Sequence, residues 1–192
     1  MKYVFCILFT GLLFAFSQED KYDLKIDSGV GSLKINTQLK DVKGFVKPVD
    51  KSGMWFPPQE SKYVSYNTYM VNMAKFPVKK FYGLTIERIE ILFQPHFTEE
   101  GEEDGQDIYE FNVFISWPGD AAHDKLIASA EKDMGPIRTY SIDESSIGSE
   151  EEIESPNWFT SKTLMTIAGK KAFKTFNGKK YLWVKYMQAF GG

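Results

Sequence analysis

Two histidines and a dense run of carboxylates are the groups in this chain best suited to chemistry. His96 lies beside a run of acidic residues and glycines at positions 99–107. Clustered carboxylates can wrap a hard cation such as calcium, and an imidazole adds a nitrogen ligand. If the run folds back onto the histidine, the expected metal ligands are His96, Glu102, Glu103, Asp104 and Asp107. The alternative is a solvated loop in which like charges repel and extend the backbone.

His123, the second histidine, is followed by Asp124. Metal hydrolases that use such a pair need further ligands, and only His96 remains to supply an imidazole, so we expect His123 to pack at a helix start or against a sheet. The chain contains no nucleophile elbow, phosphate-binding P-loop or H-E-x-x-H zinc helix. Two acids meeting in a cleft would still suffice for hydrolysis, so a secreted metal-dependent or carboxylate-based hydrolase is the alternative function.

An aromatic segment stands out at positions 54–58, where two aromatic residues precede two prolines. Rings with a polar handle are favoured where one side of a site is dry and the other is wet. The candidate ligand-binding residues are Trp55, Phe56, Tyr63 and Tyr66. In the alternative interpretation, the two prolines form a rigid turn that lays Trp55 and Phe56 on a sheet as part of the core.

Residues 1–17 have the three parts of a secretory signal peptide: Lys2, an apolar run and small residues before a cut after Ser17. The run is shorter than the roughly 17–25 residues of a membrane-spanning helix, so we expect cleavage and no membrane span thereafter. The mature chain would lack Cys6, the single cysteine, which excludes a disulfide, a thiolate nucleophile and a cysteine-ligated zinc. We therefore expect an exported protein, periplasmic or extracellular, with one α+β domain at residues 18–192.

Charge is segregated along the chain, although the net charge is only −3. Residues 99–154 carry 17 acidic against 3 basic side chains, whereas residues 155–192 carry 7 lysines and no acid. Lysines interleaved with aromatic rings can bind a polyanion, but the acidic pI of about 5.5 argues against a nucleic-acid partner. We interpret these lysines as solvent-facing residues that discourage edge-to-edge aggregation of strands.

The clearest structural signal is Asn177-Gly178, which supplies the positive φ angles of a type I′ turn and predicts a C-terminal β-hairpin. Its register pairs Phe176 with Lys179 and, continuing along both arms, Ala172 with Trp183. A second hairpin is predicted by apolar–polar alternation in residues 84–97 and 108–117, linked by the acidic run. Further strands are expected at residues 22–26, 33–37 and 158–168.

Two helices are predicted. Asp120 can cap a helix over residues 121–134, which Gly135 and a proline terminate. Its buried stripe is expected to contain Ile127, Ala130 and Met134. Residues 61–76 also fit a helical wheel, although their Tyr, Val and Thr content partly favours a strand.

These elements predict an α+β fold, mainly an antiparallel β-sheet with one or two helices packed on one face and a C-terminal β-hairpin. Since the catalytic motifs are missing, we expect an exported, non-catalytic domain that binds a ligand or a partner protein. No cofactor is expected to be required, and calcium or another divalent cation is the ion that the acidic run would take.

Overall fold

The computed structural model describes residues 22–58, 66–98, 100–142 and 154–189. Tyr63, the predicted signal peptide and most of the second acidic run lie outside these residues. Within the described residues, none of the helices has the length and the apolar character needed to cross a membrane.

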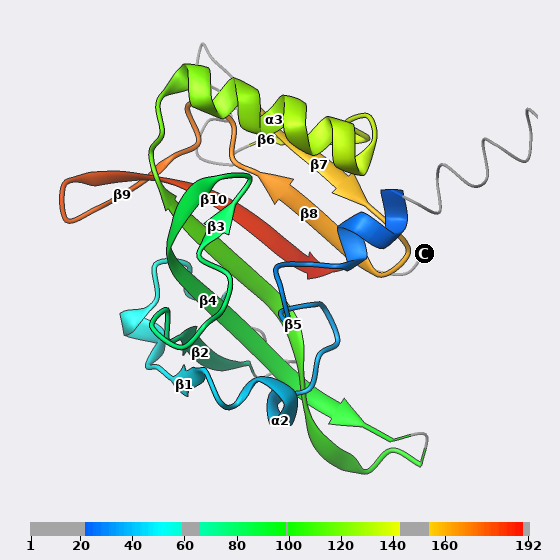
Figure 1. The fold of residues 1–192 in the computed structure, drawn as a ribbon. Helices are drawn as coiled ribbons and strands as arrows, with labels where there is room; N and C mark the ends of the chain where they lie inside the picture. Colours follow the sequence, from blue (N-terminus) through cyan, green and yellow to red (C-terminus); the bar gives the residue numbers. More distant parts are fainter. Residues whose placement is uncertain (1–21, 59–65, 99, 143–153, 190–192) are drawn as a thin grey trace, which may run out of the picture.

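A ten-stranded antiparallel sheet forms the body of the structure (Figure 1). Its strand order is β1 (Val46–Pro48), β2 (Asn67–Val71), β4 (Leu84–Phe97), β5 (Glu103–Ser116), β10 (Lys179–Gln188), β8 (Thr163–Ile167), β7 (Glu154–Phe159) and β6 (Thr139–Ile142). Two short strands pair outside this path, β3 (Lys80–Phe81) with β4 and β9 (Lys174–Phe176) with β10. The mainly antiparallel α+β fold and the C-terminal hairpin are therefore confirmed.

Helix α3 (Asp120–Met134) lies across one face of the sheet (Figure 1). A short helix at residues 22–27, a four-residue helix α2 (Leu39–Val42) and a 3-10 turn η1 (Lys51–Gly53) complete the helical elements of the described chain. The face beneath α3 is the core, because alternate residues of the central strands point to it and are buried. Its strand residues include Ile91, Phe111, Val184 and Ile167, and α3 contributes Leu126, Ala130 and Met134.

The opposite face carries a row of polar residues that crosses five strands. The pairing register places Glu90 opposite Asn112, Asn112 opposite Lys185, Lys185 opposite Thr166, and Thr166 opposite Asn157. Four of these five side chains are buried, and Thr166 Oγ1 donates a 2.7 Å hydrogen bond to Asn157 Oδ1. This second face is thus a packed polar and aromatic surface rather than a simple solvent face.

Both predicted hairpins are present, with changes at their ends. β4 spans the predicted residues, but β5 begins at Glu103, so half of the acidic run is strand rather than loop. In the C-terminal hairpin, the register Phe176–Lys179 is as predicted and holds through Lys174–Tyr181. Beyond that point the prediction was wrong, because Ala168 N donates to Trp183 O and β8 takes the edge that Ala172 was expected to occupy.

Four other local predictions were wrong. Residues 22–26 are helical, and residues 33–37 contain only an isolated bridge between Leu33 and Val30. The described part of the expected helix at 61–76 contains strand β2, held between β1 and β4. The expected strand at 158–168 is two strands, because the Thr160 hydroxyl accepts bonds from Lys162 N and Thr163 N and closes a turn.

Helix α3 itself is confirmed, and its expected cap is not. Gly119 is the N-cap with a φ of 84°, and Asp120 is the first helical residue, where its charge favours the helix dipole. The buried positions are His123, Leu126, Ala130 and Met134, whereas Ile127 is only half-buried against the core.

Candidate functional site

The outer end of the β4–β5 hairpin brings together part of the predicted metal cluster. His96 Nδ1 lies 2.5 Å from Asp107 Oδ2, and His96 Nε2 lies 3.8 Å from Asp104 Oδ1. Gly105, opposite His96 in the register, lets the two strands bulge at this end. The structure therefore places His96 between two carboxylates.

The other two predicted ligands, Glu102 and Glu103, are exposed. Glu102 N donates to Thr98 Oγ1 at 3.3 Å, and Glu103 pairs with Phe97 in the strand register. Among the described residues, no group of three or more His, Cys, Asp or Glu side chains has the arrangement needed to hold a metal ion. Metal binding by this cluster stays a prediction, and the observed contacts are those of an ion pair.

A pocket lies beside this end of the hairpin, under helix α2. The segment that precedes α2 is fixed to β5 by two 2.9 Å backbone bonds, from Asn36 N to Ile108 O and from Ile108 N to Thr37 O. The resulting cavity, which we call the α2 pocket, has a volume of about 540 Å³. Its lining residues come from four separate segments and are Gln38, Leu39, Lys40, Lys43, Val46, Pro48, Tyr69, Asp104, Gly105 and Gln106.

The α2 pocket combines apolar walls with a few polar groups, as small-molecule sites do. Leu39, Val46 and Tyr69 supply the apolar surface, and the volume lies inside the range of about 300–1,000 Å³ typical of ligand pockets. Two lysines against one aspartate give the lining a positive balance. In addition, Gln106 Oε1 is buried and has no hydrogen-bond partner among the described residues.

The predicted aromatic residues Trp55 and Phe56 lie elsewhere, on the second face of the sheet. The Trp55 ring stacks on Phe176 with centroids 4.2 Å apart and meets Phe114 edge-on at 5.0 Å. Phe56 packs against Trp183 at 5.5 Å. Both residues are half-buried in these contacts and lie on the sheet, as the alternative interpretation expected, but outside the core. Ligand binding by these rings stays a prediction.

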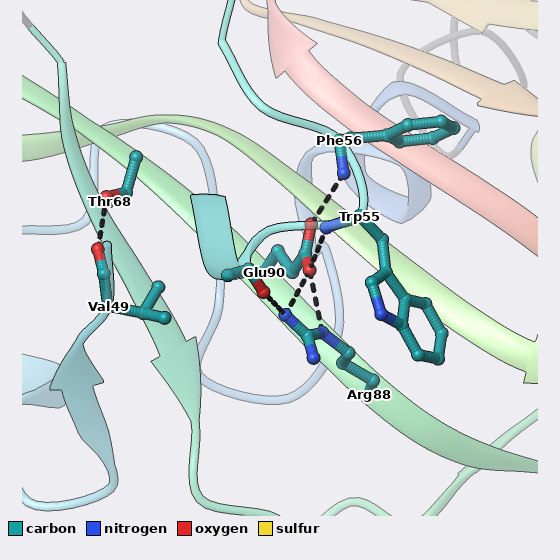
Figure 2. Close-up of polar contacts among 7 residues, drawn as sticks. Val49, Trp55, Phe56, Thr68, Arg88 and Glu90 are labelled. Carbon is teal, nitrogen blue, oxygen red and sulfur yellow. Dashed lines mark hydrogen bonds and ion pairs between the residues drawn. The ribbon is translucent and has the colours of Figure 1, made fainter. Parts of the chain in front are cut away.

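A buried carboxylate holds this aromatic segment in place (Figure 2). Glu90, which is fully buried, accepts hydrogen bonds from Trp55 N at 2.7 Å and from Phe56 N at 3.0 Å. Arg88 Nε donates to the same carboxylate at 2.6 Å and balances its charge. Arg88 also donates to Gly53 O, and its guanidinium lies 4.7 Å from the centroid of the Trp55 ring. Residues 53–56 are thus clamped to β4.

Tyr66, the third described aromatic candidate, stacks on Tyr109 with centroids 5.0 Å apart. Burial, reinforced by the hydrogen bond with Tyr66, raises the pKa of Tyr109 to about 12. The fourth candidate, Tyr63, lies outside the described residues. The described aromatic candidates therefore belong to two packing clusters.

His123 lies at the start of α3, as predicted, and packs into the core. Its Nε2 forms a 2.8 Å hydrogen bond with Ala168 O, and its ring lies 5.6 Å from that of Trp117. Asp124 is 3.9 Å away and pairs instead with Lys170 at 2.9 Å. These contacts are those of a structural histidine.

No local pattern in the sequence predicts the α2 pocket. Lys40 and Lys43 sit in and just after a four-residue helix, which is too short to show a helical period. The one available signal was Gln106, a neutral residue inside an acidic run.

Comparisons of the chain with protein-family models, with curated proteins and with solved structures found no match. Its chemistry is therefore interpreted from the geometry described above.

Proposed function

We propose that the protein is an exported, non-catalytic binding domain whose α2 pocket takes a small amphipathic anion, a carboxylate with an apolar tail. The observation that carries this proposal is the 540 Å³ cavity itself, with apolar walls and two lysines at its border. Export is supported by the layout of residues 1–17.

The distribution of groups in the pocket favours this ligand class. Leu39, Val46 and Pro48 offer a dry surface for a hydrocarbon tail. Lys40 and Lys43 are exposed, so they can approach a carboxylate at the border without first losing their hydration.

The test is a calorimetric titration of residues 18–192 with decanoate, with acetate and decyltrimethylammonium as matched probes. Decanoate is expected to bind, because it has both the tail and the negative charge. Acetate lacks the tail and the ammonium compound reverses the charge, so both should bind at least about tenfold more weakly. Equal binding of all three probes, or of none, contradicts the proposal.

A matched pair of variants tests the site. Replacing Lys40→Gln and Lys43→Gln together should weaken decanoate binding about tenfold, since each exposed ion pair contributes up to about 1 kcal/mol. Lys47→Gln is the control, because Lys47 lies between the pocket residues Val46 and Pro48 on β1 and therefore points to the other face. Export is tested separately, by mass spectrometry of the protein recovered outside the cytoplasm, whose first residue should be Gln18.

A further inference from the structure

A second, smaller pocket lies at the other end of the core, where the C-terminus of α3 meets the first helix and the β3–β4 turn. Its volume is about 230 Å³. The groups that give it chemical character are Lys25, Lys80, Tyr82, Asp133 and Tyr186. None of these residues lines the α2 pocket, so this site, which we call the tyrosine pocket, is independent of the proposed function.

Tyr186 lines the tyrosine pocket, and its hydroxyl is buried. This residue is only 1% exposed, and its ring stacks on Phe111 with centroids 4.6 Å apart. Its hydroxyl has no hydrogen-bond partner among the described residues, although buried hydroxyls almost always have one. Because burial raises the pKa of Tyr186, the group stays a neutral O–H and can both donate and accept.

Tyr82 and Asp133 form the second polar wall of this pocket. The Tyr82 hydroxyl donates to the Asp133 carboxylate, and burial together with this bond raises the pKa of Tyr82. The carboxylate keeps further lone pairs, and the Tyr82 oxygen can accept one more hydrogen bond. The wall therefore offers acceptors opposite the Tyr186 donor.

The backbone holds Tyr82 in this position against its own preference. Tyr82-Gly83 is the two-residue turn between Phe81 and Leu84, with φ angles of 47° and 82°. Asn or Asp is strongly preferred at the first position of such a turn, and this chain uses Asn at the equivalent place in Asn177-Gly178, with φ angles of 49° and 75°. A tyrosine at this position lowers stability because of its positive φ. The contact of its hydroxyl with Asp133 would explain why a tyrosine is nevertheless found here.

We propose that the tyrosine pocket binds a small neutral polyhydroxylated molecule, of the size of a monosaccharide. The volume of the tyrosine pocket is below that of pockets for drug-sized ligands, so only a small molecule fits in it. Asp133 disfavours an anion, and the two lysines at the border disfavour a cation. A ligand hydroxyl, in contrast, accepts from Tyr186 and donates to Asp133 at once, while Val78 and Phe81 cover its C–H surface.

The experiment is a thermal-shift and calorimetric titration of residues 18–192 with D-glucose, D-galactose and D-mannose, and separately with glycine, L-glutamate and acetate. At least one sugar is expected to raise the melting temperature and to bind. If no sugar binds at about 50 mM, or if only the charged probes bind, the proposal is overturned.

Two substitutions connect any binding to the pocket. Tyr186→Phe removes only the buried hydroxyl, so the free protein should be at least as stable as before while sugar binding weakens about tenfold. Tyr82→Asn supplies the preferred turn residue and removes the second hydroxyl, and it should likewise keep the fold and weaken binding. Unchanged sugar affinity in both variants would contradict the assignment, as would a loss of stability in Tyr186→Phe, which would reveal a structural partner for the hydroxyl.

Matched controls separate this site from the rest of the molecule. Tyr140→Phe removes a hydroxyl from an exposed tyrosine and should leave sugar binding unchanged. The double variant Lys40→Gln with Lys43→Gln should weaken decanoate binding without affecting the sugar. Each of the two proposals can therefore fail while the other stands.

Discussion

Replacing Glu90 by glutamine should loosen the aromatic segment from the sheet, because this one carboxylate accepts the backbone bonds from both Trp55 and Phe56. The wild-type group accepts from Trp55 N, Phe56 N and Arg88, and is fully buried. A glutamine has the same shape and keeps one oxygen, so it can still accept from one backbone N–H. Its NH₂ group, however, faces the second N–H, and Arg88 loses its counter-charge.

The magnitude follows from these losses. A hydrogen bond to a charged group contributes about 1.5–3 kcal/mol, and one such bond to the backbone is lost together with the ion pair. The Arg88 side chain is 18% exposed, so water replaces part of what the guanidinium loses. We expect Glu90→Gln to lower the free energy of unfolding by about 3 kcal/mol, which for a chain of this size lowers the melting temperature by about 6–12 °C.

The assay is urea denaturation followed by circular dichroism and by tryptophan fluorescence, to which Trp55 contributes as one of four tryptophans. Glu87→Gln is the matched control: Glu87 is exposed on the same strand and accepts one 3.1 Å bond from Ser116 Oγ, so its loss should change stability by less than about 0.5 kcal/mol. If Glu90→Gln is also neutral, the buried carboxylate does not hold the segment and the reasoning fails.

Three more outcomes follow from the structure. Gly178→Ala should lower the free energy of unfolding by about 1 kcal/mol, because Gly178 has a φ of 75°. Gly44→Ala is the control, since Gly44 has open space around it and no positive φ. Equal effects of the two substitutions would refute the turn assignment. Between pH 10 and 12 stability should fall as pH rises, because the unfolded chain ionises its tyrosines near pH 10 while Tyr109 in the folded chain has a pKa of about 12. Tyr66→Phe should lower the Tyr109 pKa, seen in the phenolate absorbance, yet leave it above the ordinary value because burial is the larger cause.

Local patterns predicted the elements whose determinants are close in sequence. Asn177-Gly178 forms its turn through its own φ preferences, and β4 alternates in residue type because Ile89, Ile91 and Phe93 belong to the core while Arg88 and Glu90 lie on the opposite face. Helix α3 is likewise long enough to show its period.

The wrong predictions concern short or ambiguous segments. Residues 22–26 alternate like a strand but are helical, with Ile26 packed into the core. In β2, pairing with both neighbours outweighed the helical spacing, in agreement with the Tyr, Val and Thr content that partly favoured a strand. Contacts with distant segments decide such cases, and no local pattern contains them.

The sequence by itself determined the antiparallel α+β character, the two hairpins, the long helix and the absence of a cysteine pair, because each follows from a local period, a turn or a count. Only the tertiary structure decided which residues share a site. It turned Trp55 and Phe56 onto the sheet through Glu90, a residue 34 positions from Phe56. It assembled the α2 pocket from four segments and placed the Tyr186 hydroxyl beside Tyr82 and Asp133. Side chains that meet across a sheet are set by the pairing register of whole strands, which depends on the packing of the entire core.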